Sequence, residues 1–472
     1  MSGFIQGQAR NQSALFPEYL DDFVAEESAV RLIDFFIDDL NLSGLGFKTV
    51  PNSKGRPGYH PEIMLKLFIY GYFNRVQSSR RLEREAQRNI ELMWLVGRLA
   101  PDFKTIADFR KNNGKAIRLV CREFVMLCKK FDLFKDAFVA IDGSKFKAVN
   151  NRDRNFTRAK MERRLAEVDA SIDRYLGELT KVDVQESANK TERIKDKIDA
   201  LKADMAKLKT LEIEMLESPD KQVSLTDPDS RSMKSRGSGI VGFNVQIAVD
   251  VKHHLITNHL VTNEGSDRSQ LSSVAGQAKE VLGVESLDAV ADRGYYNGEE
   301  LLACEESGIT PYVPKPLTSN NKAKGLFDKS DFIYKADDNE YECPAGERMT
   351  YRTTREQRGK TLYYYYTAAC HECPIKAKCT MAKHRQITRW EHEDVMERTE
   401  ARLQDNPDMM KIRRAAVEHP FGTLKCWMGS THFLTKTLGR VSTEMSLHVL
   451  SYNMKRMINI VGIRAMMEEI TA

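Results

Sequence analysis

The stretch LFKDAFVAIDGSKFKA (Leu133–Ala148) decides the fold. Phe138 to Ile141 are four consecutive apolar residues that predict a buried β-strand, and Asp142 closes the run. Burying an unpaired carboxylate costs free energy, so an acid in this position usually has a functional role. In α/β folds the functional site lies at the carboxyl ends of the strands. The alternative is that Asp142 caps the Asp-Gly-Ser turn that follows.

The chain has 472 residues, enough for several domains, each with its own core. Its composition, 41% hydrophobic and 29% charged, is that of a soluble globular protein and excludes a disordered one. No stretch approaches the ~18 to 20 apolar residues that a membrane span requires, and the first residues lack a signal-peptide pattern. We therefore expect a cytoplasmic, nucleoid-associated protein that makes no membrane contact.

Positive charge is concentrated near the N-terminus. Residues 51–130 contain 17 Lys and Arg but only 7 Asp and Glu, although the whole chain carries a net charge of only +5. This excess favours a polyanionic partner, DNA or RNA, over the alternative of a solvated basic face.

Short helices are predicted in the same region. Pro61 suits the first position of a helix, a second helix should span residues 80–97, and Thr105 with Asp108 forms a capping-box pattern for a third. A fourth should span residues 116–131. Together they suggest a helix-turn-helix-like DNA-binding unit. Its candidate DNA contacts are Arg80, Arg81, Arg84, Arg88, Arg110 and Lys111.

Two different sequence patterns follow the predicted strand that ends at Asp142. Residues 158–217 show heptad spacing in two segments, which predicts an inserted antiparallel helical hairpin. From residue 242 the pattern is a β-hairpin with its turn near residues 252–254, then helix, strand, helix and strand. This order predicts an α/β fold.

The sequence surroundings of two further acids make them candidate metal ligands. Asp292 follows the short apolar strand Ala289–Ala291, as Asp142 follows its own strand. Neighbouring carboxylates repel unless a cation lies between them, and hard oxygen ligands suit Mg²⁺ or Mn²⁺. Glu418 should share a helix face with Arg414, near Lys425, with Pro420 kinking or restarting the helix. The alternative for Glu418 is an ordinary Arg–Glu pair on an exposed helix.

Four cysteines lie within a short hydrophilic segment. Their pattern is Cys343, then Cys370-x2-Cys373-x5-Cys379. Four thiolates satisfy a tetrahedral structural Zn²⁺ site, and in a cytosolic protein such a cluster indicates metal before disulfide. His371 or His384 could replace one ligand.

The segments IDGSK around Asp142, ADRGYY around Asp292 and VEHPFGTLK around Glu418 are similar to the three signature blocks of bacterial insertion-sequence DDE transposases. The segment LTDPDSRSMK with GFNVQIAVD also resembles one branch of that family, which has a basic helical N-terminal domain and a cysteine-bearing segment before the Glu. The resemblance covers residues from about 15 to 460. It implies an RNase H-like catalytic domain with a helical-hairpin insertion and a Cys-rich insertion, preceded by an all-α DNA-binding domain.

The resemblance also implies the chemistry. Asp142 would bridge two Mg²⁺ or Mn²⁺ ions, Asp292 and Glu418 would each hold one, and the two ions would clamp the attacking and leaving oxygens of a phosphoryl transfer. Further DNA contacts are expected at Arg293, Arg414 and Lys425. The partners would be double-stranded DNA, as element ends and target, and a second copy when ends are paired. The alternatives are a nuclease without strand transfer and a silent, transposase-derived DNA-binding protein.

The expected division of the chain follows from these patterns. It is a helical DNA-binding domain (1–130), an RNase H-like core (131–157 and 218–318), the inserted hairpin (158–217), the Cys-rich insertion (319–400) and C-terminal helices carrying Glu418 (401–472).

Overall fold

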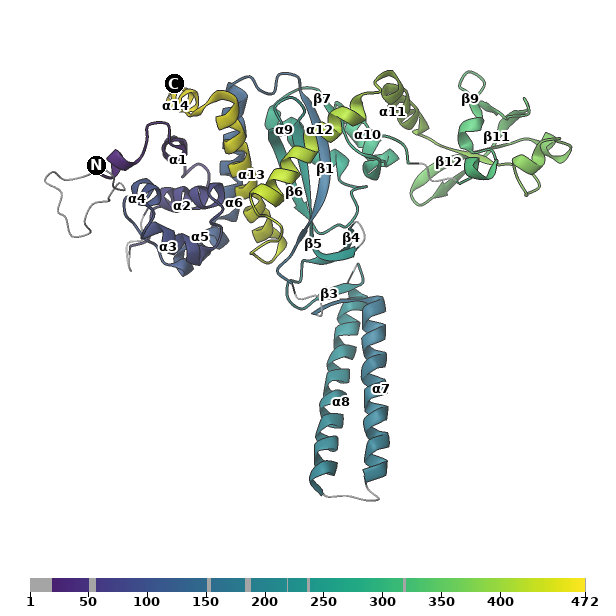
Figure 1. Ribbon diagram of the computed structural model, residues 1–472. Helices are drawn as coiled ribbons and strands as arrows, with labels where there is room; N and C mark the ends of the chain where they lie inside the picture. Colours follow the sequence, from purple (N-terminus) through teal and green to yellow (C-terminus); the bar gives the residue numbers. More distant parts are fainter. Residues whose placement is uncertain are drawn as a thin grey trace, which may run out of the picture.

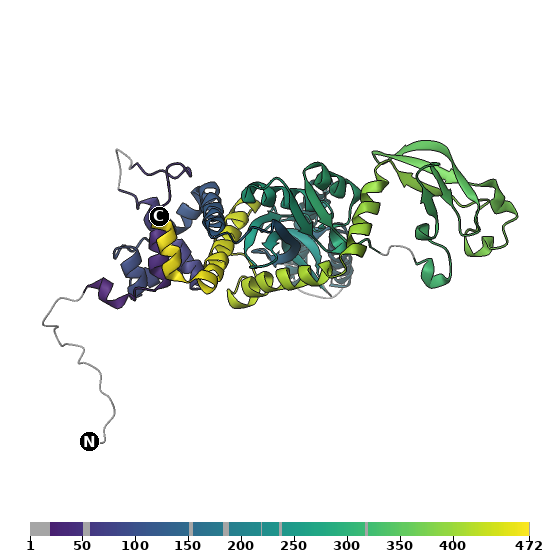
Figure 2. The same ribbon diagram turned by 90° about the horizontal axis from the view of Figure 1, so that it is seen from above.

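The computed structural model describes residues 19–50, 57–150, 154–182, 188–218, 220–235, 238–316 and 320–471. The molecule is elongated, with helices at one end, a mixed sheet in the middle and a cysteine-bearing sheet at the other end (Figures 1 and 2). A long helical arm projects from the middle (Figure 1). Across these ranges, no helix combines the length and apolar character needed to cross a bilayer.

The N-terminal region is helical, as predicted, but two local predictions were wrong. Residues 80–97 form two helices because the Asn89 side chain accepts a hydrogen bond from Leu92 N and so caps a new helix start. Asp102, rather than Thr105, caps the next helix, by accepting from Lys104 N and Thr105 N. The helices are α1 (Ala29–Asp38), α2 (Pro61–Phe73), α3 (Ser79–Ala86), α4 (Ile90–Leu95), α5 (Phe103–Asn112) and α6 (Gly114–Lys130).

A mixed sheet forms the centre, in the order β4–β5–β1–β7–β8, with β6 also paired to β5. β1 runs antiparallel to β5 and parallel to β7, and β7 runs parallel to β8. The predicted hairpin and the alternation of helix and strand after it are confirmed. The elements are β1 (Phe138–Lys147), β4 (Arg231–Ser235), β5 (Ser238–Asp250), β6 (Ile256–Thr262), α9 (Leu271–Leu282), β7 (Leu287–Val290), α10 (Gly298–Glu306) and β8 (Ile309–Tyr312).

The position of Asp142 within its strand differs from the prediction. Asp142 lies in the middle of β1, so the Asp-Gly-Ser segment is strand and not a turn. The strand continues because β5 pairs with it as far as Lys147, whereas its parallel partner β7 ends opposite Ala140. Asp142 therefore lies beyond the end of the parallel pair while remaining inside the antiparallel one.

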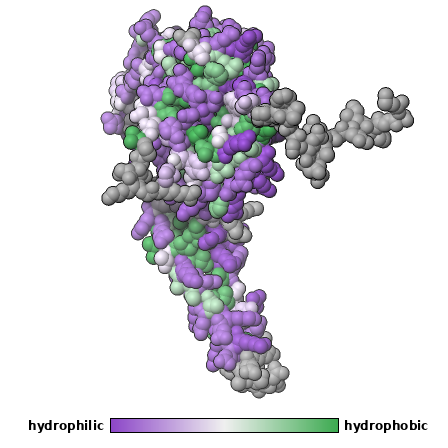
Figure 3. Space-filling view, turned by 90° about the vertical axis from the view of Figure 1, so that its left-hand side faces the viewer, coloured by the Kyte–Doolittle hydropathy of each residue, from purple (hydrophilic) through white to green (hydrophobic). Residues whose placement is uncertain are grey.

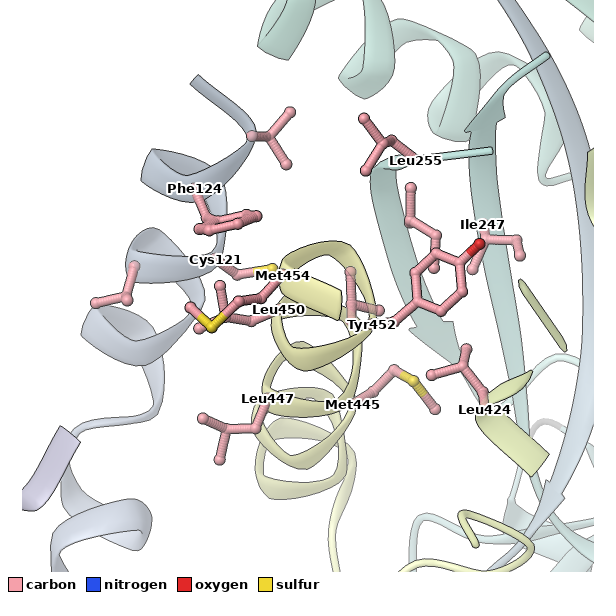
Figure 4. Packing of buried hydrophobic residues seen from close by; sticks show 14 of the residues in the cluster. Cys121, Phe124, Ile247, Leu255, Leu424, Met445, Leu447, Leu450, Tyr452 and Met454 are labelled. Carbon is pink, nitrogen blue, oxygen red and sulfur yellow. The ribbon is translucent and has the colours of Figure 1, made fainter. Parts of the chain in front are cut away.

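Helix α13 (Leu438–Val461) is the centre of the hydrophobic core. Leu450 lies beside Cys121 of α6, Leu447 is on the same side of α13 one turn away, and Tyr452 faces the sheet (Figure 4). Figure 2 shows α13 between the N-terminal helices and the sheet, and α14 (Ile463–Thr471) packs on α1. One continuous core thus joins the N-terminal helices, the sheet and the C-terminal helices.

Two buried or half-buried acids hold the start of α13. Asp227 Oδ1 accepts from Thr437 N at 3.1 Å, and Asp229 Oδ2 accepts from Leu438 N at 2.8 Å. Carboxylates at a helix N-terminus satisfy free N–H groups and complement the helix dipole. The loop Thr226–Asp229 thereby ties the sheet to the C-terminal helices.

The arm consists of α7 (Arg158–Val182) and α8 (Ala188–Glu217), with β2 (Asn155–Thr157) and β3 (Gln222–Ser224) paired at its base. Its helices pack side by side through a separate core that includes Met161, Val168 and Leu208. Exposed apolar side chains remain on the arm, among them Ile213 at 60% exposure, and Figure 3 shows hydrophobic patches along its upper part.

The cysteine-bearing region is an antiparallel sheet with its own small core. Its strands are β9 (Ile333–Lys335), β10 (Glu340–Glu342), β11 (Arg348–Gln357), β12 (Lys360–Tyr366) and β13 (Ile387–Trp390). Helix α11 (Glu393–Asp405) then leads back to α12 (Met409–Gly422), which lies across the central sheet (Figure 1).

Candidate active site

Two of the three predicted acids lie together at the end of the parallel strands. Asp142 follows the last β1–β7 pair, Ala140 with Val290, and Asp292 follows the end of β7 by two residues. On α12, Arg413 Nη2 lies 2.5 Å from Asp142 Oδ1 and 3.6 Å from Asp292 Oδ2. One guanidinium therefore neutralises both carboxylates.

The two acids differ in their environments. The Asp142 side chain is 25% exposed, and its burial raises the pKa of that carboxyl to about 6, even though Arg413 and the Gly143 N–H lower it. The charge of Asp292 raises the Asp142 pKa further. Asp292 is more exposed, at 45%, and its Oδ1 accepts from Gly294 N at 2.7 Å.

A third acid near Asp142 is Asp267, which the sequence reasoning missed. Its Oδ1 accepts hydrogen bonds from Asn244 Nδ2 and Gln246 Nε2, both at 2.7 Å, and from Lys145 Nζ at 3.2 Å. Its charge also contributes to the raised pKa of Asp142. A signal was present, because Asn244 and Gln246 interrupt an otherwise apolar strand, and buried amides require partners.

Tyr295 completes this polar layer beneath the site. It is fully buried and donates its hydroxyl proton to Gln246 Oε1. Burial raises the pKa of the Tyr295 hydroxyl well above its ordinary value, so the group stays a proton donor. Tyr295 is therefore a core residue that positions β5.

Glu418 does not join the two aspartates in this structure. It lies five residues after Arg413 on α12, which is about 140° around an α-helix. Its neighbours Ala416, Val417 and Pro420 are buried, whereas Glu418 is exposed and forms no hydrogen bond or ion pair with any described residue. The alternative for Glu418, an ion pair with Arg414, is likewise absent among the described residues. Over those residues, no group of three His, Cys, Asp or Glu side chains is arranged to hold a metal ion.

Pro420 neither ends nor restarts the helix. α12 continues through it to Gly422 and then widens into a π-helical turn, Thr423–Trp427. This turn carries Lys425 to the sheet, where Nζ donates to Ser144 Oγ at 2.5 Å and to Lys145 O at 3.1 Å. Lys425 therefore contacts β1 next to Asp142. π-Helical turns occur frequently at functional sites.

The predicted DNA contacts divide into exposed and buried residues. Arg110 is 9% exposed and donates to Tyr72 OH at 2.8 Å, so its side chain belongs to the helical core and the prediction of a DNA contact was wrong. Arg80 lies over the Phe103 ring, and Arg88 is paired with Glu85. Lys425 is half-buried against β1. The other predicted residues have exposed side chains: Arg81, Arg84, Lys111, Arg293 and Arg414.

The four clustered cysteines surround one small cavity. Cys343, Cys370, Cys373 and Cys379 line a space of about 20 Å³, and none of them is in a disulfide. Burial raises the pKa of the Cys379 thiol, and the other three thiols raise it further. His384 stacks instead on Tyr366, and His371 lines a different pocket. The cysteines converge, although not in the arrangement of a formed metal site.

Comparison with known proteins gives two family matches. Residues 18–112 match a transposase domain (DUF772), and residues 342–458 match a transposase DDE domain. Glu418 lies inside the second range, whereas Asp142 and Asp292 lie outside both. No curated protein matches the chain significantly.

One solved structure resembles the chain at low similarity. It is described as the piggyBac transposase synaptic complex with hairpin DNA, with 8% sequence identity, a TM-score of 0.27, and coverage of 94% of this chain and 79% of that one. That TM-score is too low to support an argument about fold. The two family matches agree with the resemblance to insertion-sequence DDE transposases: a range near the N-terminus is similar to a transposase domain, and a range towards the C-terminus is similar to a transposase DDE domain.

Proposed function

We propose that this protein is a transposase that binds the ends of a mobile DNA element, cleaves them and joins them to target DNA by metal-dependent phosphoryl transfer. The observation that carries the proposal is the pairing of Asp142 and Asp292 around one cationic group. Nothing in the packing of the strands requires two carboxylates at this edge, and their mutual repulsion opposes it. A site for a metal ion and a phosphate explains both acids.

The arrangement of the central sheet supports an RNase H-like catalytic domain. Three antiparallel strands, β6, β5 and β1, are followed by two strands, β7 and β8, that run parallel to β1. Asp142 lies on the central strand β1, and Asp292 lies just after β7. The hairpin arm and the cysteine-bearing sheet are then the two insertions.

The residues at this edge fit a divalent cation. Arg413 Nη2 marks a point within reach of both carboxylates, and Mg²⁺ needs only one or two carboxylates when water and substrate phosphate supply the other ligands. We propose two divalent ions, Mg²⁺ or Mn²⁺. When bound, they would activate the attacking oxygen and stabilise the leaving oxygen of the phosphoryl transfer. Only the resemblance of the VEHPFGTLK segment supports Glu418 as a further ligand, because in the structure Glu418 does not lie with the two aspartates.

The other residues at this edge have supporting roles. Arg413 bridges the two carboxylates, and its guanidinium would have to move away for a divalent ion to bind between them. Lys425 fixes α12 against β1 through Ser144. Exposed Arg293 directly follows Asp292 in the sequence, and exposed Arg414 directly follows Arg413. We assign Arg293 and Arg414 to the DNA backbone near the scissile bond.

The rest of the chain supplies binding in this proposal. The basic N-terminal helices, with Arg80, Arg81, Arg84, Arg88 and Lys111, contact duplex DNA, and the arm with exposed Ile213 brings a second copy to a paired-end complex. Such a protein works at the nucleoid in the cytoplasm.

An end-joining assay tests the proposed function. Purified protein, Mg²⁺, a labelled duplex taken from the DNA flanking the gene and a supercoiled target plasmid should give labelled plasmid. The same duplex supplied already cut separates joining from cleavage. Cleavage without joining would favour a nuclease, and binding without either reaction would favour a silent DNA-binding protein.

We also propose that the four cysteines hold a structural Zn²⁺ ion. The purified protein should contain about one zinc per chain, because four converging thiols are the ligand set of a closed tetrahedral site. Replacing Cys370 and Cys373 by Ser should lower that content to near zero and destabilise the cysteine-bearing sheet. Buried Cys304→Ser is the matched control and should keep its zinc. Wild-type protein that contains no zinc after expression in zinc-supplemented medium would contradict the assignment.

A further inference from the structure

A cationic pocket lies where the N-terminal helices meet α12 and α13. It has a volume of about 480 Å³, within the range of small-ligand sites. Its lining comes from three separate parts of the chain: Arg75, His419, Thr423, Trp427, Met428, Tyr452, Lys455, Arg456 and Asn459. None of the predicted site residues is among them.

The positive charge of this pocket is not balanced by acids. Arg75, Lys455 and Arg456 line it, no Asp or Glu does, and none of the three forms an ion pair with a described residue. Arg456 donates to His253 O at 2.8 Å, and Lys455 Nζ lies over the Phe73 ring at 4.1 Å. Burial and the neighbouring charge of Arg75 both lower the pKa of Lys455. Neighbouring positive charges repel one another, and a bound anion would reduce this repulsion.

An exposed aromatic ring stands beside these cations. Trp427 is 69% exposed although it belongs to an ordered π-helical turn, which Met428 anchors by accepting a hydrogen bond from Gln77 Nε2 at its carbonyl. A large apolar ring next to several cations is the combination that binds single-stranded nucleic acid, since phosphates meet the cations and a base stacks on the ring.

The pocket is connected to the candidate active site by α12. Arg413, at the acids, and Thr423, in the pocket, are ten residues apart, which is about 15 Å along a helix. Glu418 lies between them. A DNA strand running along this helix would pass the acids and reach the pocket a few nucleotides from the scissile bond.

We propose that this pocket binds an unpaired nucleotide at the end of the DNA substrate, with its phosphate held by Arg75, Lys455 and Arg456 and its base stacked on Trp427. A concave site of this size admits a single extruded or overhanging nucleotide but not a base pair held within a duplex. The inference rests on the proposed function for the identity of the polymer, and it adds the form in which the DNA end is held.

Binding should be measured with a blunt duplex and with the same duplex carrying an unpaired 3′ extension. The protein should carry Asp142→Asn so that no cleavage occurs. We expect the extension to tighten binding roughly tenfold and to quench Trp427 fluorescence, because base stacking on an aromatic ring stabilises the complex. Trp427→Ala, Arg75→Gln and Lys455→Gln should each remove most of this gain while leaving the blunt-duplex affinity nearly unchanged. Arg464→Gln, which removes a charge from α14, is the matched control and should keep the gain.

Equal affinity for the two duplexes, or a preference that survives Trp427→Ala and Lys455→Gln, would overturn the proposal. The salt dependence provides a second readout, because each lost phosphate contact should reduce the slope of log affinity against log salt by about 0.7. Failure of the proposed function would look different: the wild-type protein would not cleave DNA, whereas the Trp427-dependent preference would remain.

Discussion

Replacing Asp142 by Asn should reduce cleavage of the element ends by at least about a thousandfold, which corresponds to about 4 kcal/mol of transition-state stabilisation. The amide keeps the shape of the side chain, but it removes the charge that attracts the guanidinium of Arg413 and that would bind a divalent ion. Gel-based cleavage of labelled ends under single-turnover conditions measures the effect. Asp292→Asn should give a loss of similar size.

The control for this experiment is Asp136→Asn, since Asp136 is an exposed acid just before β1 that is paired with Lys252. It should retain wild-type cleavage. All three variants should bind end DNA normally and melt as cooperatively as the wild type. Cleavage by Asp142→Asn within tenfold of the wild-type rate would refute the assignment of this residue.

Glu418→Gln should also reduce the rate of cleavage about a thousandfold, without a measurable change in the free energy of unfolding. Glu418 is exposed and has no partner among the described residues, and changes at such surface positions usually alter the free energy of unfolding by less than about 0.5 kcal/mol. Cleavage rate and thermal unfolding measured on the same preparation check both parts. Loss of activity at unchanged stability would mean that α12 turns Glu418 towards the aspartates when DNA and metal bind.

Asp267 is the natural comparison for Glu418, because it is the acid that the structure places near Asp142. Asp267→Asn should destabilise the fold, since its Oδ1 accepts hydrogen bonds from two buried amides and Lys145, and it should slow cleavage less than Glu418→Gln does. If Glu418→Gln remained active and Asp267→Asn did not, Asp267 would be the third acid of the site.

Much of the central sheet could be predicted from the sequence. Phe138–Ile141 predicted β1 because a short apolar run suits a strand buried on both faces, and the alternation after residue 242 predicted the β5–β6 hairpin. The extension of β1 through Asp142 to Lys147 could not be predicted, because it depends on the register of β5, a partner about 100 residues further along the chain. Local pattern identifies a strand but not how far its partner follows it.

The candidate site was predictable only in part, for a similar reason. Asp142 and Asp292 could be grouped because each follows a short run of apolar residues and parallel strands end together. Arg413 could not be paired with them, because nothing in its own segment indicates which face of α12 meets the sheet. Arg110 was misplaced because a basic residue on a short amphipathic helix is usually exposed, whereas here Tyr72 accepts its hydrogen bond inside the core.

The most direct test of the central claim is the number of Mn²⁺ ions bound per chain, measured by electron paramagnetic resonance. The wild-type protein should bind Mn²⁺ at the Asp142–Asp292 edge, and Asp142→Asn and Asp292→Asn should each weaken this binding at least tenfold. Arg413→Gln should tighten it, because the guanidinium that the ion must displace is gone. Mn²⁺ binding that is identical in the wild type and all three variants would contradict the claim that these two aspartates form the metal site of a transposase.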